Sequence, residues 1–304
     1  MSAQRRGADV FAFQLMTVLC VIWGMQQVAI KLAAADIVPI MQAAGRSGIA
    51  ALLVGLLMCW RGGWARMRRD TLGAGLLAGG LFALEFLLIA VGLQYTTASH
   101  MAVFLYTAPI FSALGLHFLL PSERLCAQQW LGIGVCFIGI AVAFGAGMLM
   151  SEIDTQILIG DALGVLGGMA WGATTVVVRA SKLSEAPPTL TLFYQLFVGF
   201  VVLLAIAAAT GQIGKVELTP ISIGSLLFQG VLVSFISYFA WFWLLRRYLA
   251  SNLAVFSFMT PLFGVTFGAL LLGEPLTISF LIGAVLVLLG ILLASGWRGF
   301  RRGS

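Results

Sequence analysis

The stretch WGMQQVAIKLAAADIVP, residues 23–39, has a counterpart 148 positions later in WGATTVVVRASKLSEAP, residues 171–187. Each copy opens on a tryptophan-glycine pair, carries a cation eight residues after the tryptophan, and ends in proline. Self-similarity at a fixed spacing is the signature of one structural unit used more than once. The sequence therefore predicts two halves, residues 1–150 and 151–304, built on the same plan.

The composition places the chain in a membrane. It is 61% hydrophobic and 9% charged, whereas soluble proteins are about half apolar and a quarter charged. The net charge of +6 does not indicate a nucleic-acid partner, because the cations gather in short clusters between apolar runs, as membrane topology places them. The four cysteines have no close pairing and no neighbouring histidines, so neither a disulfide framework nor a metal site is expected.

Apolar stretches of about 20 residues, the length that crosses the hydrocarbon core as a helix, recur along the whole chain. They cover residues 12–34, 38–60, 72–93, 98–119, 126–147, 159–181, 189–210, 221–244, 251–272 and 278–297. Lysine and arginine collect in the segments on the N-terminal side, which predicts cytoplasmic N- and C-termini. Five spans per half insert the second half upside down. The predicted fold is an all-α integral membrane protein, with ten transmembrane helices in two inverted five-helix repeats.

Further matches between the halves extend the pattern. Residues 98–109 align with 250–261, and residues 123–139 align with 274–290. With this doubled pattern the chain resembles the drug/metabolite transporter superfamily, in its ten-helix form with two EamA-type domains. The resemblance spans essentially the whole chain. Within the superfamily the chain looks most like the aromatic amino acid exporters of the YddG type, a branch that also handles flat cationic compounds such as paraquat.

The resemblance implies a secondary transporter that exports small organic metabolites, most of all aromatic or apolar amino acids, by alternating access through a central cavity between the repeats. The alternatives are an exporter of cationic drugs or other metabolites, and a channel or scaffold. It also implies a multi-pass protein of the bacterial inner membrane that acts as a monomer in lipid, with a small-molecule substrate and no cofactor. An enzyme is not expected, because the H-E-x-x-H, G-x-S-x-G and P-loop motifs are absent from the sequence.

Glu85 is the only carboxylate well inside an expected span. An ionisable group at such depth is costly and usually faces a cavity or a partner. Arg46 lies on the preceding span at a similar depth, about 12 Å below the outer face at about 1.5 Å per residue. Two interpretations stay open. Glu85 either pairs with Arg46 to hold two helices together, or it attracts a substrate ammonium group or carries a proton.

Pro109 and Pro261 interrupt two spans at equivalent positions, and paired interruptions point to a transporter's binding site. This places Tyr106 on the cavity wall. Trp23 and Trp171 lie deeper than the other tryptophans, which cluster at span ends, and are the candidates for stacking on a substrate. The polar candidates, for which helix-to-helix hydrogen bonding is an equally good explanation, are Gln26, Thr174, Ser237 and Tyr238.

Other conspicuous residues are expected to be structural. Lys31 and Pro39 mark the end of one helix and the start of the next. Asp161 is placed at the outer edge of a span, not at depth. His100 lies near an interface, where histidines are commonly solvated or hydrogen-bonded. Glycines at every fourth residue from Gly160 line a close-packing face of their helix.

Overall fold

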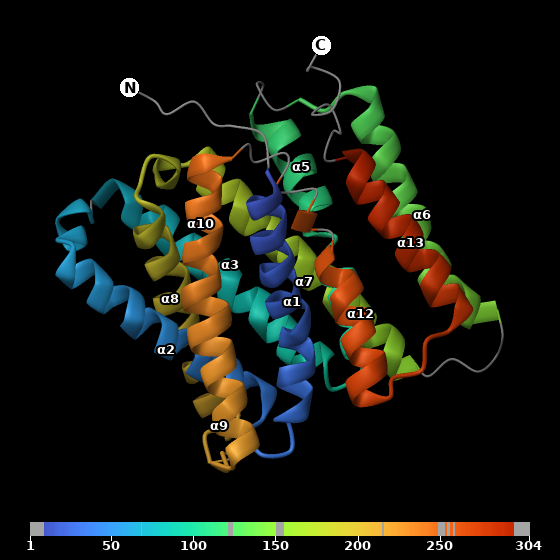
Figure 1. Ribbon diagram of the computed structural model, residues 1–304, viewed down its shortest axis with the longest axis horizontal. Coiled ribbons are helices and arrows are strands. Elements are labelled where there is room, and N and C mark those ends of the chain that lie inside the picture. The colour runs from blue at the N-terminus through green and yellow to red at the C-terminus, as the bar shows by residue number, and fades with distance from the viewer. Residues whose placement is uncertain are drawn as a thin grey trace.

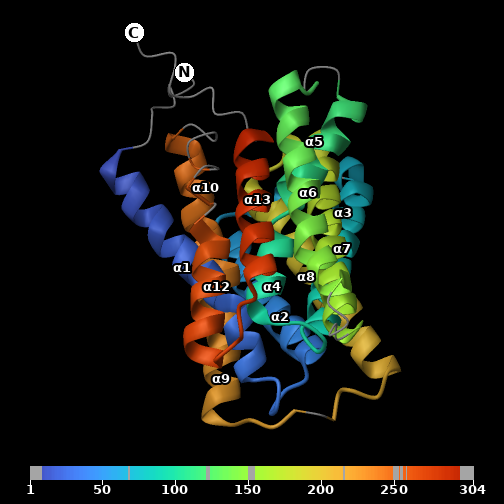
Figure 2. The same cartoon turned by 90° about the vertical axis from the view of Figure 1, so that its right-hand side faces the viewer.

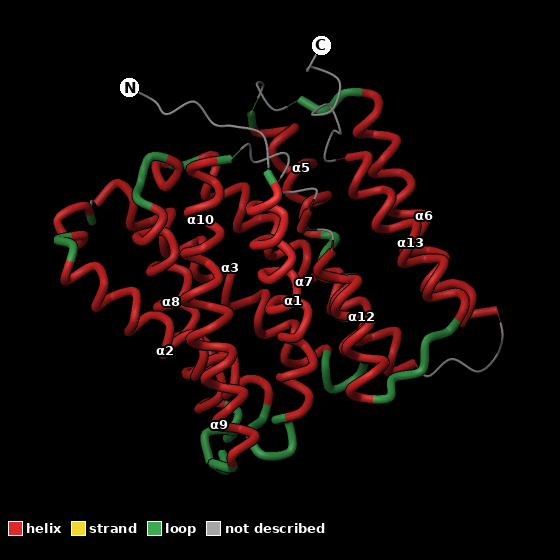
Figure 3. Tube along the Cα trace, viewed as in Figure 1, coloured by secondary structure: helices red, strands yellow, loops and turns green. Residues whose placement is uncertain are grey.

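The protein is described by a computed structural model, in which the described residues are 9–67, 69–120, 124–149, 155–214, 216–248, 253, 256–257 and 259–294. Helices and the turns that join them make up this part of the chain, together with one isolated antiparallel bridge between Ile37 and Val216 (Figure 3). The helices stand side by side in one bundle, and α1 begins at the same end of the bundle at which α13 ends (Figures 1 and 2).

Within the described residues, seven helices are long and apolar enough to cross a membrane. They are α1 (Val10–Leu32), α2 (Pro39–Trp60), α3 (Arg69–Gly92), the span Ala98–Leu119, α7 (Thr155–Ala180), α8 (Pro188–Ala209) and the span Pro220–Trp241. Three further helices are α6 (Ala127–Leu149), α12 (Met259–Leu272) and α13 (Ile278–Ala294), whose apolar parts are shorter. Two short 3-10 turns, η1 (Gly63–Arg66) and η3 (Lys182–Ser184), follow α2 and α7. The protein is therefore a helical membrane protein.

The helix ends follow from local chemistry. Proline occupies the first position of α2, α8 and α9 (Pro220–Leu227), where its fixed φ suits a helix and its missing N–H costs nothing. Thr219 caps α9 in a capping box with Ser222. Gly211 and Gly273, after α8 and α12, have φ of 67° and 65°, a conformation that glycine adopts without a steric penalty.

Two of the expected spans are not continuous α-helices. The span Ala98–Leu119 is divided into α4 (Ala98–Leu105) and α5 (Ala108–Leu119), with the break just before Pro109, as the sequence predicted. The span that starts at Pro220 passes from α9 into a π-helical segment, η4 (Phe228–Ser237), and then into α10 (Tyr238–Arg247). In η4 the Ser234 hydroxyl donates to the carbonyl of Gln229, five residues earlier, at 2.9 Å. No pattern in the sequence analysis predicted this widened helix.

Helix packing brings distant parts of the chain together. α6 packs along α13, α1 along α12, and α2 along α8, while α3 lies against both α7 and α8. The half-helix α4 contacts α12, α7 and α1, whereas α5 contacts chiefly α7. Glycines permit the closest of these approaches: a Cβ added at Gly283 of α13 would lie 2.7 Å from the carbonyl oxygen of Gly139 on α6.

The turns between the helices lie at two opposite ends of the bundle. We call the end that holds the α1–α2 turn, the α3–α4 turn and the α8–α9 connection the Pro39 end, and the opposite end the Trp60 end (Figure 1). A buried apolar cluster of α2, α3 and α8 fills one side of the bundle between these ends. A second joins α4, α5, α6 and α13, and a third joins α1 to α10.

Candidate functional site

Five side chains from five elements form one group inside the bundle, in which each member interacts with at least one other. Arg46 comes from α2, Glu85 from α3, Tyr106 from the α4–α5 break, Trp171 from α7 and Tyr238 from the start of α10. We call them the central cluster. Arg46 interacts electrostatically with Glu85 and Tyr238, and the two tyrosine hydroxyls interact with each other. The rings of Tyr106 and Trp171 meet edge to face, with centroids 5.5 Å apart.

Arg46 is fully buried, and its hydrogen bonds go to α2's neighbour η4. Its Nε and Nη2 both donate to the Ser234 hydroxyl, at 3.0 and 2.6 Å, and its guanidinium lies 4.1 Å from the centroid of the Phe86 ring. Its Nη1 has no hydrogen-bond partner. The direct Arg46–Glu85 ion pair considered from the sequence is therefore not the contact that holds Arg46, because matched depth does not fix which way each helix faces.

Glu85 is 7% exposed. Within the described residues its carboxylate makes no hydrogen bond and no ion pair as short as 4 Å, and its interaction with Arg46 acts through space. Most buried polar groups are hydrogen-bonded, and a carboxylate in an apolar environment is the most costly one to leave without a partner. Glu85 thus has a full capacity to accept hydrogen bonds.

A chain of amides continues from Arg46 toward the Pro39 end. The Gln229 Nε2 donates to the Gln42 Oε1 and to the Ser225 hydroxyl, both at 2.9 Å, and the Gln42 Nε2 donates to the carbonyls of Ile30 and Ile37 at 3.0 and 2.8 Å. The chain fixes α2 and η4 to the end of α1. The sequence analysis missed both glutamines, although an amide inside an apolar span is a signal that could have found them.

The remaining predicted residues are Trp23, Ser237, Thr174 and Gln26. The Trp23 Nε1 donates to the Ser237 hydroxyl at 2.8 Å, and the Trp23 ring lies 5.8 Å from that of Trp241, which places both predicted residues next to Tyr238. The Thr174 hydroxyl donates at 2.9 Å to the Ala170 carbonyl of its own helix.

Gln26 is buried on α1, one turn beyond Trp23, and makes no hydrogen bond within the described residues. Trp23 and Ser237 therefore adjoin the central cluster through Tyr238, and Thr174 is satisfied within its own helix.

At the Pro39 end, Glu274 clamps the first turn of α4. Its Oε1 accepts from the Ala98 N–H at 2.7 Å, and its Oε2 accepts from the N–H and hydroxyl of Ser99 at 2.9 and 2.7 Å. The Lys31 Nζ lies 3.7 Å from the Glu274 Oε1. Lys31 lies in the last turn of α1, as predicted, and in addition it joins α1 to this clamp.

A second carboxylate holds α4 from the other side. Asp161 of α7 is 2% exposed, accepts a hydrogen bond from the Thr96 hydroxyl, and has its Oδ2 2.8 Å from the Nδ1 of His100. The His100 ring stacks on Phe280 of α13 at 3.9 Å. Asp161 therefore lies near the start of α7, at the edge of the span as expected, and is buried and partnered there. Sequence alone could not pair it with residues some sixty positions away.

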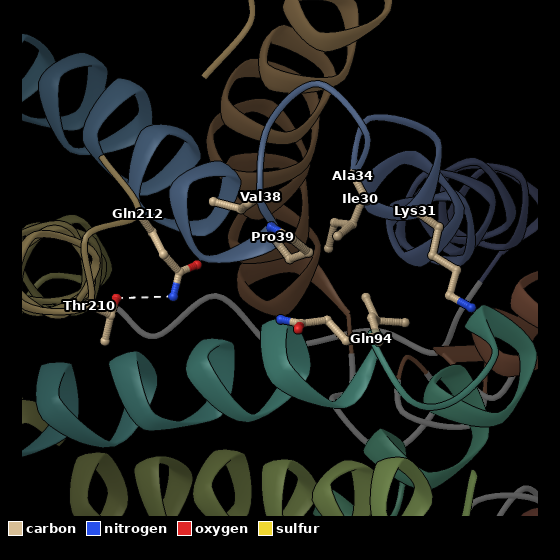
Figure 4. A pocket seen from close by; sticks show the side chains of 9 residues that line it. Ile30, Lys31, Ala34, Val38, Pro39, Gln94, Thr210 and Gln212 are labelled. Atoms are coloured by element: carbon tan, nitrogen blue, oxygen red, sulfur yellow. Dashed lines mark hydrogen bonds between the residues drawn. The ribbon is translucent and has the colours of Figure 1, made fainter. Parts of the chain in front are cut away.

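A pocket of about 410 Å³ lies at the same end, between the α1–α2 turn and the ends of α3 and α8. Its wall combines apolar residues with the side chains of Lys31, Gln94, Thr210 and Gln212 (Figure 4). The Gln212 Nε2 donates to the Thr210 hydroxyl at 3.0 Å. This pocket is separate from the central cluster.

A bundle of apolar helices that buries an arginine, a carboxylate and several aromatic rings at its centre has the construction of a membrane transporter. The sequence profile of the EamA-like transporter family matches residues 10–145 and 158–296, and the chain belongs to this family. It is a membrane transporter of the drug/metabolite transporter type.

Similar proteins include transporters from several bacteria. The Uncharacterized transporter YoaV of Bacillus subtilis is 28% identical over 275 residues, covering 90% of this chain and 92% of the relative. A probable amino-acid metabolite efflux pump of Salmonella typhimurium is 26% identical over 288 residues, covering 91% and 92%. A crystal structure at 15% identity superposes with a TM-score of 0.64 over 94% of this chain and 96% of that one, which shows the same fold.

Proposed function

We propose that the protein is a secondary exporter of small organic metabolites, with aromatic or apolar amino acids as its main substrate class. The observation that carries this proposal is the central cluster, where a partnerless buried carboxylate and a buried arginine adjoin aromatic rings. Transporter sites lie near the middle of the membrane and use such groups to bind substrate. The printed name of the Salmonella typhimurium relative, an amino-acid metabolite efflux pump, supports the same direction.

The architecture proposed for this function is ten spans in two inverted repeats, residues 1–150 and 151–304. The helix contacts support it when α4–α5 and α9–α10 are each counted as one span. If each span of the first half is exchanged with its counterpart in the second half, every contact should have an equivalent. The α1–α12 contact corresponds to the contact of α4 and α5 with α7. The α3–α8 contact corresponds to the contact of η4 with α2. The α6–α13 and α2–α8 contacts exchange with themselves. A pseudo-two-fold arrangement of this kind underlies alternating access.

The distribution of lysine and arginine supports cytoplasmic termini, which would place the Pro39 end outside. At that end α4 is held against α1, α7 and α12 by contacts that include the Glu274 and Asp161 hydrogen bonds. In this proposal the described conformation is closed to the outside, and a substrate would reach the central cluster from the cytoplasm. The protein would act as a monomer in lipid, in a bacterial inner membrane.

Cationic drugs are the second candidate substrate class. A carboxylate in the same cluster as an edge-to-face aromatic pair suits an organic cation, through charge attraction and cation–π contacts. The two candidates differ in whether a carboxylate on the substrate matters for binding.

Transport by the purified protein in proteoliposomes tests the function. We expect saturable uptake of labelled tryptophan, phenylalanine or leucine in counterflow, with empty liposomes, a nucleotide sugar and a polyamine as controls. Saturable uptake of a flat organic dication without uptake of any amino acid would replace the first candidate by the second. Unsaturable ion conductance without solute uptake would identify a channel and overturn the proposal.

A further inference from the structure

We propose that Arg46 and Glu85 form a two-point subsite for the zwitterionic part of an α-amino acid. Glu85 takes the α-ammonium group, and the free Nη1 of Arg46 takes the α-carboxylate. The substrate's side chain then lies against the aromatic residues of the central cluster. This inference rests on the proposed function and deepens it, because it names the chemical group that the site recognises.

The arginine side of the subsite follows from counting its donors. A guanidinium has five N–H groups in a rigid fork. The Ser234 hydroxyl takes hydrogen bonds from Nε and Nη2, and the Tyr238 hydroxyl interacts with the same guanidinium, whereas Nη1 is buried and makes no hydrogen bond. Leaving a charged donor unsatisfied in a buried position is costly, so a ligand that brings an acceptor removes that cost when it binds. A carboxylate is the acceptor that matches a guanidinium best.

The glutamate side has the complementary vacancy in its hydrogen bonding. Glu85 is 7% exposed, and its carboxylate accepts no hydrogen bond within the described part of the chain. Its oxygens are not within 4 Å of the Arg46 nitrogens, although the two charges interact. A direct ion pair would have satisfied both groups at once. Their separation leaves each of them able to bind a ligand group of the opposite charge.

Charge balance selects the ligand. When both groups are ionised, Arg46 and Glu85 together carry no net charge, and a zwitterion adds none. A plain amine or a plain carboxylic acid would instead bring one uncompensated charge into a desolvated site, which is strongly unfavourable. A polyamine would bring several. The subsite therefore favours neutral zwitterions over ligands that share only one end of the amino acid.

The guanidinium is held in place before a ligand arrives. Phe86 covers one face at 4.1 Å, and Ser234 is itself fixed by donating to the carbonyl of Gln229. Holding the group in its bound position lowers the entropy that binding must overcome. Tyr106 and Trp171 provide an edge-to-face aromatic pair for the substrate's side chain.

Competition against labelled tryptophan in proteoliposomes tests the subsite. Two analogues each lack one charge: tryptamine has no carboxylate, and indole-3-propionate has no ammonium group. For the wild-type protein we expect each analogue to compete at least about 30-fold more weakly than tryptophan, as expected when one partner of a buried charged contact is lost. Equal competition by tryptophan and both analogues would overturn the inference.

Two variants assign the two ends. Glu85→Gln should bring indole-3-propionate to within about threefold of tryptophan while tryptamine stays weak, and Arg46→Gln should do the reverse. Arg46→Lys should weaken tryptophan binding and retain the preference for a carboxylate. Thr266→Val serves as the matched control, because that exposed hydroxyl bonds only to the Leu262 carbonyl of its own helix.

The outcomes separate this inference from the proposed function. Size-exclusion profiles and melting curves identify variants that fail to fold, and if Arg46→Gln is one of them, Glu85→Gln and Arg46→Lys decide. Tryptophan transport with unchanged analogue preferences in the folded variants would reject the subsite and leave the function standing. Absence of amino acid transport by the wild-type protein would reject both.

Discussion

The acidic side chains at the Pro39 end and the one at the centre of the bundle are in opposite situations. Asp161 and Glu274 each accept hydrogen bonds from the first turn of α4 or from the residues before it, and Glu274 also lies near a lysine ammonium. Asp36, in the α1–α2 turn, accepts from the Thr219 hydroxyl. Glu85 has the same chemistry and comparable burial, yet it has none of these contacts. A satisfied carboxylate stabilises one arrangement of helices, whereas an unsatisfied one keeps its binding capacity for something that the protein does not itself supply.

The largest effect should come from Glu85→Gln. We expect transport to fall at least about 30-fold, because a buried charged contact to the substrate is lost. Stability should change by only about 1 kcal/mol in either direction, because the variant removes a buried carboxylate but leaves the Arg46 guanidinium without its electrostatic partner. Transport in proteoliposomes and thermal unfolding in detergent measure the two effects. Near-normal transport by the folded variant would show that Glu85 does not differ in function from the carboxylates at the Pro39 end.

Glu274→Ala should give the opposite pattern, with stability as the main loss. Two N–H groups and a hydroxyl in the first turn of α4 lose their acceptor, which costs about 2 to 3 kcal/mol. Loosening of α4 should also make the fully buried Cys20 reactive to an impermeant maleimide added outside.

Cys136, fully buried between α6 and α13, is the internal control for global unfolding. Peptide mapping by mass spectrometry reads both thiols in one sample. Unchanged melting together with an unreactive Cys20 would show that Glu274 does not hold the Pro39 end closed.

Gly160→Ala tests how tightly α7 approaches the residues that Asp161 holds. An added Cβ would lie 2.6 Å from the backbone nitrogen of Thr96 and 2.9 Å from the carbonyl oxygen of Gly92, so the helices must separate. We expect a loss of about 1 to 3 kcal/mol. Gly80→Ala is the matched control, because no atom lies within 4 Å of its added Cβ and alanine favours a helix. Equal melting temperatures for the two variants would contradict the close approach.

The smallest effect should come from Asp161→Asn. The amide oxygen can still accept from the Thr96 hydroxyl, so only the charge facing His100 is lost. A loss of about 1 kcal/mol is expected, well below that of Glu274→Ala. A greater loss of stability than that of Glu274→Ala, measured by the same melting assay, would show that Asp161 contributes more to stability than Glu274.

The sequence predicted those features of the fold that depend on local chemistry. Pro109 predicted the break between α4 and α5, because a proline removes a backbone hydrogen bond from a helix. Tyr106 could be placed next to that break, and Trp171 deeper in its span than most of the other tryptophans, and both lie in the central cluster.

The contacts of Arg46 could not be predicted in the same way. Its depth matched Glu85, but its hydrogen bonds go to Ser234, because the rotation of each helix about its axis decides which side chains face each other. The Glu274 and Asp161 clamps join segments far apart in the chain, and a single sequence carries no signal for such pairs. The π-helical turns of η4 likewise depend on packing and not on any one residue type.

The π-helical form of η4 changes the number of helical turns that this segment makes. Each of its hydrogen bonds spans one residue more than in an α-helix, so its ten residues make fewer turns than the same length of α-helix would. Rewinding the segment as an α-helix would rotate everything after it relative to everything before it. Ser237 and Tyr238 would then swing together around the helix axis and away from Trp23, while α9 kept its cap at Thr219. A single change of helical pitch would thereby redirect two side chains next to the central cluster in concert.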